Sequence, residues 1–233
     1  MIDDLTISPR YAEAGTRSAK DTIVTSQDVW AAAAYAQRIN GAYLKNPVFS
    51  TEPLPTKTKD TSRNVMLESL KNLTVLTEDD YQVGSAALEW HNKKLTYKSL
   101  VNQLSDFDRS LINACRARDF SLESDRAFIA IICSQIQSYQ NGVRVDEAQA
   151  KVDHSAPILG EVGAKVTHKV EIVSGVYSKN YNVYFLNALT DTNQMVLFSY
   201  RERLVPGSVH TIRGTVKGFK GDVCQLNRVK KID

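Results

Sequence analysis

The chain has 233 residues, of which 42% are hydrophobic and 24% charged, and its formal net charge is +3. This balance is ordinary for a folded, water-soluble protein, and the length allows one large or two small domains. No apolar run approaches the roughly 18 residues that a membrane span needs. The acidic start, Met1–Ser8, lacks the apolar core of a signal peptide.

The cysteines indicate a reducing compartment. Cys115, Cys133 and Cys224 are odd in number and far apart in the sequence. Cys115 and Cys133 lie on apolar helix faces, where we expect them to act as small core residues. A cytoplasmic location follows as the expectation.

The first two thirds of the chain predict a flexible segment and a helical domain. Residues 1–24 are polar, contain Pro9 and Gly15 and show no periodicity, so we expect a flexible N-terminal segment. Residues 25–142 carry apolar residues at helical spacing, with Thr25 or Ser26, Thr77 and Ser105 as caps. The expected helices are Gln27–Asn40, Ser62–Lys71, Thr77–His91, Thr96–Leu104, Asp106–Arg116 and Ser121–Tyr139.

A linker and a β-domain complete the chain. Asn141-Gly142 is expected to stop the last helix, and 143–164, with Pro157, Gly160 and Gly163, is expected to be the linker. Residues 165–233 predict five short strands joined by turns, which indicates a small five-stranded antiparallel barrel of the oligonucleotide-binding (OB) type. The fold class is therefore α+β. The expected strands are Lys165–Tyr177, Tyr181–Thr190, Gln194–Arg201, Val209–Gly218 and Asp222–Ile232.

Alternation within the strands predicts which residues face the core. Ile212, Gly214 and Val216 fall on one face of the fourth strand, where the glycine lets the sheet bend. Phe185 and Phe198 are expected inside the barrel. The last strand does not alternate cleanly, and a bulge near Asn227 would restore its phase.

Positive charge and aromatic rings gather in the same domain. Residues 165–233 contain eleven Lys or Arg and five Asp or Glu, a net charge of +6, so the rest of the chain carries −3. Cations follow a phosphate backbone and exposed rings stack on bases, so the pattern predicts a groove for single-stranded nucleic acid. A solvated charged face and core aromatics are the simpler alternative. The candidate contacts are Lys179, Tyr181, Tyr184, Tyr200, Arg201, Arg203, Arg213, Lys217, Phe219 and Lys220.

Motifs for catalysis are absent from the sequence. No phosphate-binding glycine loop, zinc spacing or nucleophile motif occurs, and the four histidines are scattered. We therefore expect a protein that is not an enzyme and that has no catalytic residues, no metal and no cofactor.

Two stretches carry a resemblance. Asp28–Gly41 followed by Tyr43-Leu44-Lys45, and Leu204–Gly207 with Ile212–Lys217 and Gln225–Lys230, resemble proteins of tailed-phage early or replication gene regions. The resemblance implies a phage protein acting near DNA replication or recombination in the host cytoplasm. It supplies no site residues.

Two hypotheses follow. The first is a protein that binds single-stranded DNA, or RNA, and whose helical domain recruits a replication partner or forms a homo-oligomer. The second is a protein–protein adaptor, for instance one that binds a host factor or inhibits host defence. The C-terminal Lys230-Lys231-Ile232-Asp233 lacks the acidic tail of many strand-coating proteins, which favours the second.

Overall fold

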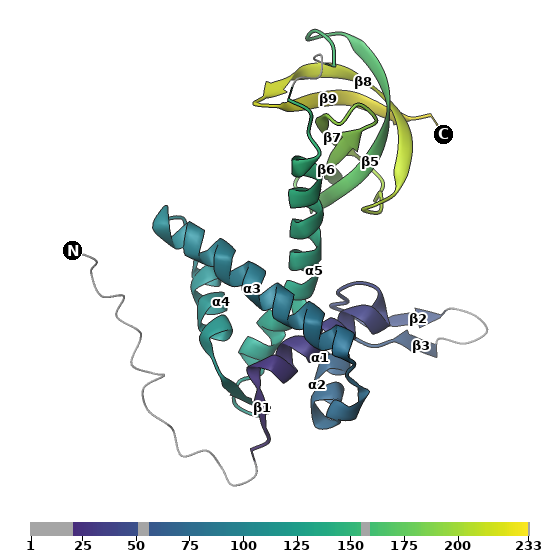
Figure 1. Cartoon of the computed structure of the whole chain (residues 1–233). Coiled ribbons are helices and arrows are strands. Elements are labelled where there is room, and N and C mark those ends of the chain that lie inside the picture. Colours follow the sequence, from purple (N-terminus) through teal and green to yellow (C-terminus); the bar gives the residue numbers. More distant parts are fainter. Residues whose placement is uncertain (1–20, 51–55, 155–158, 233) are drawn as a thin grey trace. The chain divides into compact units, whose positions relative to one another are not determined.

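A computed structural model describes residues 21–50, 56–154 and 159–232. The chain divides into two compact units, a helical unit, Met1–Gln137, and a barrel unit, Ser138–Asp233 (Figure 1). Most of the segment 1–24, predicted to be flexible, lies outside the described residues. The long helix α5 contributes residues to both units.

The helical unit combines helices with two small ribbons of strand. β1 pairs antiparallel with β4, and β2 with β3, and these short strands were not predicted. The elements are β1 (Ile23–Thr25), α1 (Ser26–Asn40), β2 (Val48–Ser50), β3 (Thr56–Lys59), α2 (Ser62–Lys71), the 3-10 turn η2 (Leu73–Val75), α3 (Glu78–Leu100), α4 (Asp106–Arg116), β4 (Asp119–Ser121) and α5 (Arg126–Ala150).

Helix α1 is the centre of the helical unit. Thr25 and Asp28 form a capping box at its start, and Gly41, with φ of +72°, ends it in the left-handed conformation. Its middle is an alanine-rich run that is buried on all sides, as expected for a central helix. The small side chains allow α3 to approach closely at Gly84, where an added Cβ would lie 2.7 Å from backbone atoms of Trp30 and Ala31.

A charged contact joins α1 to the start of α3. The Arg38 guanidinium donates through Nε and Nη2 to the two carboxylate oxygens of Asp80, at 2.9 and 2.8 Å. Asp80 also accepts hydrogen bonds from the backbone N–H and the hydroxyl of Thr77, the cap residue of α3. One buried carboxylate therefore caps α3 and anchors α1.

Three of the expected helices were wrong in their limits. Thr77–His91 and Thr96–Leu104 were expected as separate helices, whereas α3 runs without a break from Glu78 to Leu100 because its inner face continues through His91 and Leu95. The last helix begins at Arg126, since Phe120 and Ser121 belong to β4. It also passes through Asn141-Gly142 to Ala150, because Val145 and Ala148 pack on the barrel.

The predicted five-stranded barrel is confirmed, in the strand order β5-β6-β7-β9-β8 with β8 closing on β5. The expectation of an all-antiparallel sheet was wrong, because β7 and β9 pair in parallel. A closed ring with an odd number of strands cannot alternate direction throughout, so one parallel pair is required. The strands are β5 (Lys165–Ser178), β6 (Val183–Thr190), β7 (Met195–Tyr200), β8 (Val209–Lys220) and β9 (Val223–Lys231).

The barrel core confirms most of the predicted alternation. Ile212 and Val216 are buried, and an added Cβ on Gly214 would lie 3.0 Å from Val229 and 3.3 Å from Leu226. Phe198 is buried as expected. Phe185 is 40% exposed, so its predicted place in the core was wrong; Leu186 and Ala188 set the inward phase of β6.

The predicted bulge in the last strand is present beside Asn227. Arg213 pairs with Lys230 and Thr215 with Asn227. Arg228 and Val229 of β9 therefore lie opposite the single residue Gly214 of β8. Arg228 takes up the extra residue with a φ of +53°. The bulge returns Lys230 to the outer surface.

Candidate nucleic-acid interface

One outer wall of the barrel, formed by β5, β8 and β9, carries cations and threonines side by side. Val166 and Val170 on β5, and Ile212, Gly214 and Val216 on β8, share one phase with His168 and His210, and this phase faces inward. The residues between them face outward. We call this surface the basic stripe. It consists of Lys165, Thr167 and Lys169 on β5, Thr211, Arg213 and Thr215 on β8, and Lys230 on β9.

Strand register brings the basic stripe together in rows. Arg213 lies between Thr167 and Lys230, whereas Lys165 pairs with Thr215 and Lys169 with Thr211. Directly paired residues place their Cβ atoms about 5 Å apart, and alternate residues on a strand lie about 7 Å apart. Lysine, arginine and threonine side chains are common donors to nucleic-acid phosphates.

The cations of the basic stripe are exposed and unpaired. Lys165, Lys169, Arg213 and Lys230 are all exposed, and none forms an ion pair within the described part of the chain. No carboxylate lies in the three rows; Glu171, next along β5, borders them. Their charge is therefore available to an anionic ligand.

A second exposed surface surrounds the turn between β5 and β6, and we call it the aromatic tip. It is formed by Val176, Tyr177, Tyr181 and Phe185, all exposed, with Tyr181 at 73%. The rings of Tyr181 and Phe185 meet edge to face, with centroids 6.1 Å apart. The Tyr177 hydroxyl donates to the Asn182 side chain at 2.7 Å. Such rings have the exposure that base stacking requires.

The predicted contact residues fall into four groups. Arg213 lies on the basic stripe, and Lys217 is exposed beside it, at the second register shift of β8. Lys179 and Tyr181 belong to the turn at the aromatic tip, while Phe219 and Lys220 lie at the β8–β9 turn. The members near the end of β7 are Tyr184, its cross-strand partner Tyr200, and the exposed Arg201 and Arg203.

The structure does not bring all ten predicted residues into one groove. Tyr184 and Tyr200 are half-buried and pack against the barrel core, so they are poorly placed for stacking. Thr167 of the basic stripe and Tyr177 of the aromatic tip are ten residues apart on β5, about 33 Å of extended strand. Strand β5 nevertheless contributes to both surfaces.

Helix α5 covers part of the barrel surface that OB folds use for ligands. That surface is the outer face of the second and third strands, here β6 and β7. Leu189, Met195 and Val223 point outward, next to inward-facing Ala188, Val196 and Cys224, and they pack with Ala148 of α5. The part of this face near the β8–β9 turn is thus occupied by the chain itself. The face near the aromatic tip remains open.

Sequence analysis missed three of the four cations of the basic stripe as contacts. Lys165, Lys169 and Lys230 were not among the predicted contacts, although Lys165–Val170 alternates between polar and inward-facing residues. That alternation was a usable signal for the two lysines of β5. The place of Lys230 on the basic stripe depends on the bulge and on its pairing with Arg213, and no local sequence pattern reveals either.

The cysteines and His91 serve mostly as structural residues. The three cysteines are free and buried, and burial raises the pKa of Cys115 and of Cys133 to about 12, so their thiols stay protonated. His91 is buried between Trp30 and Trp90, and burial lowers its pKa.

Within the described residues, no three His, Cys, Asp or Glu side chains gather as a metal site requires. No described helix is long and apolar enough to cross a membrane.

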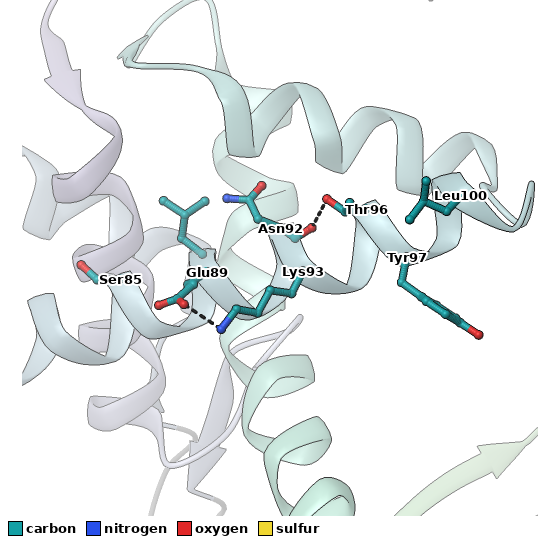
Figure 2. A pocket seen from close by; sticks show the side chains of 8 residues that line it. Ser85, Glu89, Asn92, Lys93, Thr96, Tyr97 and Leu100 are labelled. Carbon is teal, nitrogen blue, oxygen red and sulfur yellow. Dashed lines mark hydrogen bonds and ion pairs between the residues drawn. The ribbon is translucent and has the colours of Figure 1, made fainter. Parts of the chain in front are cut away.

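A large surface hollow, of about 630 Å³, lies along α3 and is lined by that helix alone (Figure 2). Its polar groups are used locally: Lys93 pairs with Glu89 at 2.7 Å, and the Thr96 hydroxyl donates to the Asn92 carbonyl at 2.8 Å. Figure 2 shows the side chains following one another along the helix rather than converging. The lining residues therefore do not form a convergent site.

Comparisons with protein-family models, with curated proteins and with solved structures found no match to this chain. The functional argument therefore depends on the residues themselves.

Proposed function

We propose that the protein binds single-stranded nucleic acid, without catalysis, through the basic stripe of its barrel. The observation that carries the proposal is the set of four exposed, unpaired cations separated by threonines on adjoining strands. Their charges attract phosphates, and the threonine hydroxyls add hydrogen bonds. On the resemblance in the sequence, we further propose that this activity serves phage DNA replication or recombination.

The aromatic tip supplies the second part of the proposed interface. A strand that follows β5 would contact phosphate-binding cations along its first half and reach the open rings of Tyr181 and Phe185 beyond its second half. Phosphate contacts give salt-dependent affinity, whereas stacking favours unpaired bases. The combination therefore selects single strands over duplex.

Neutralising the basic stripe tests the proposal. In the variant Lys165→Gln, Lys169→Gln, Arg213→Gln and Lys230→Gln, affinity for a labelled oligo-dT of about 30 nucleotides should fall about tenfold or more at low salt. The log–log salt slope should decrease by about 3, because each lost contact with a single strand removes about 0.7. Fluorescence anisotropy over a salt series measures both quantities, with the matching duplex beside it.

A charge-matched variant provides the control. Lys45, Lys57, Lys71 and Lys93 lie in the helical unit and are exposed, so changing all four to glutamine alters the net charge equally. This control should leave the affinity near that of the unchanged protein. Equal losses in both variants, or no binding by the unchanged protein at low salt, would refute the stripe as the interface.

A protein-interaction role is the second candidate, and a different surface favours it. Tyr97, Leu100 and Val101 at the end of α3, and Phe107 at the start of α4, are exposed apolar residues; Leu100 is 78% exposed. Helix α3 also begins with Glu78 and Asp79 and carries lysines in its second half. Two copies paired antiparallel along α3 would bring opposite charges together. We propose this surface as a contact between copies of the chain.

The oligomeric state tests this second candidate. The unchanged protein should form a dimer at micromolar concentration in light scattering coupled to gel filtration, and Leu100→Asp with Phe107→Asp should make it monomeric, because charges are excluded from interface cores. The exposed pair Lys71→Gln and Glu68→Gln on α2 is the control and should stay dimeric. If the unchanged protein is a monomer at every concentration, the proposal that this surface joins copies of the chain is refuted.

A further inference from the structure

One row of outward-facing residues runs around the barrel, across the strands rather than along them, and we call it the cross-strand row. In a closed barrel the strand register is staggered, so a row that crosses every strand returns to its first strand at a different residue. This row leaves β5 near its start, on the basic stripe, and returns to β5 near its end, at the aromatic tip. Its members are Lys165 on β5, Thr215 on β8, Asn227 on β9, Ser199 on β7, Phe185 on β6 and Val176 on β5.

Strand register defines the steps of the cross-strand row. Thr215 of β8 pairs with members of the row on both sides, one on β5 and one on β9. Phe185 of β6 does the same, with partners on β7 and β5. Asn227 and Ser199 each follow directly after the last pair that joins β9 to β7, so these two residues are neighbours. Five steps of about 4.8 Å between adjacent strands make the row about 24 Å long.

The middle of β5 is a poor path between the same two surfaces. Glu171 follows the lysines of the basic stripe, is exposed, and would repel phosphates. Val173 is only 5% exposed, because it packs with Ala148 of α5. A second carboxylate, that of Glu147 on α5, lines the same small hollow as Glu171, together with two cations of that helix. A nucleic acid that stayed on β5 would therefore meet both a carboxylate and the covering helix.

The cross-strand row has neither obstacle. Asn227, Ser199, Phe185 and Val176 are all exposed, and the row contains a lysine but no carboxylate. The amide of Asn227 and the hydroxyl of Ser199 are groups that form hydrogen bonds with phosphates and with base edges. From the basic stripe to the aromatic tip, the row thus passes from a phosphate-binding cation through neutral donors to an aromatic ring.

We propose that single-stranded nucleic acid crosses the barrel along the cross-strand row, so that Asn227 and Ser199 are further contact residues. This path rests on the proposed function, because only a strand held by the basic stripe would take it. It joins the basic stripe to the aromatic tip without passing under α5. A length of about 24 Å holds about seven nucleotides at the stacked spacing of roughly 3.4 Å, and fewer in an extended strand.

Carboxylates placed on the row test the path. Asn227→Asp with Ser199→Asp should weaken binding of a labelled oligo-dT of about 30 nucleotides at least tenfold at low salt, because both charges would face the phosphates. Val209→Asp with Thr192→Asp, at exposed positions of the barrel outside the row, is the charge-matched control and should weaken binding less than about threefold. Fluorescence anisotropy measures both affinities, and circular dichroism checks that both variants are folded.

Removal of the Glu171 carboxylate distinguishes the two paths. Glu171→Gln should change the affinity less than about threefold, because the strand avoids the middle of β5. A larger gain in affinity, with the row variant binding as tightly as the unchanged protein, would overturn the cross-strand path and leave the proposed function standing. Equal weakening by the row variant and its control would also overturn the path. If the unchanged protein does not bind oligo-dT at low salt, the proposed function itself is refuted.

Discussion

Replacing Gly84 by alanine should destabilise the helical unit by about 3 kcal/mol, although the same change in an ordinary helix stabilises by roughly 1 kcal/mol. The reversal comes from the crossing of α1 and α3. A Cβ at Gly84 would lie 2.7 Å from the Trp30 carbonyl carbon and from the Ala31 backbone nitrogen. These are backbone atoms of a buried helix, so they cannot move aside as a flexible side chain could.

Denaturant unfolding followed by tryptophan fluorescence measures this effect. Both tryptophans, Trp30 and Trp90, belong to the helical unit, so the signal reports that unit alone. Ser85→Ala, at the neighbouring and exposed position, should change the stability by less than about 0.5 kcal/mol. A Gly84→Ala protein as stable as the unchanged one would show that α1 and α3 do not approach this closely.

Replacing Asp80 by asparagine should cost about 2–3 kcal/mol, from the loss of charge-assisted hydrogen bonds and a weakened helix cap. The Asp80 side chain is 2% exposed and accepts four hydrogen bonds, two from Arg38 and two from Thr77. Oδ1 accepts one of these bonds and Oδ2 accepts three, so the amide nitrogen of asparagine presents N–H groups where at least one bond needs an acceptor. Chemical unfolding at neutral pH measures the loss. Asp79→Asn, exposed in the same turn, is the matched control and should cost about 0.5 kcal/mol or less.

The Asp80 contribution should also depend on pH. Burial by itself raises the pKa of Asp80, but the hydrogen bonds from Arg38 and Thr77 outweigh it and hold the pKa below its ordinary value. The stabilisation is therefore complete above about pH 5, where the unfolded carboxyl is ionised, and is lost as the pH falls through the lowered folded pKa. Asp80→Asn should make the curve of stability against pH less steep below about pH 4. An unchanged slope would contradict the role of the carboxylate.

The features that sequence analysis predicted well are those determined by neighbours in the chain. The strands of the barrel follow from alternation and turn residues. Helices α2 and α4 begin and end at the residues expected from their apolar spacing and, for α4, from the cap Ser105. Errors arose where contacts between residues far apart in the sequence determine the structure. Helix α5 continues beyond Asn141-Gly142 because Ala148 has the barrel to pack on, and this packing outweighs the weak helix propensity of the pair. The parallel β7–β9 pair follows from the closure of a five-stranded barrel, and only an argument about the topology of the whole sheet could have predicted it.

The candidate interface was predictable only in part for a related reason. Arg213 and its threonine neighbours could be assigned to one face, because a single strand fixes their alternation. Joining them to Tyr181 and Tyr184 required the register of β5, which places the two groups on different halves of that strand. The role of Tyr184 likewise depended on whether its ring turns toward the core, as it does.

The path of α5 determines how the barrel can be studied in isolation. A recombinant fragment beginning at the first strand would lack Val145, Ala148 and Val152 and would leave Val173, Leu189, Met195 and Val223 uncovered. An exposed apolar face of this kind on a β-rich fragment promotes aggregation, and aggregation is easily mistaken for binding in nucleic-acid assays. A fragment beginning near Ser138 retains the covering turns of the helix. The most useful first residue of a barrel fragment therefore lies inside α5, and not at the end of that helix.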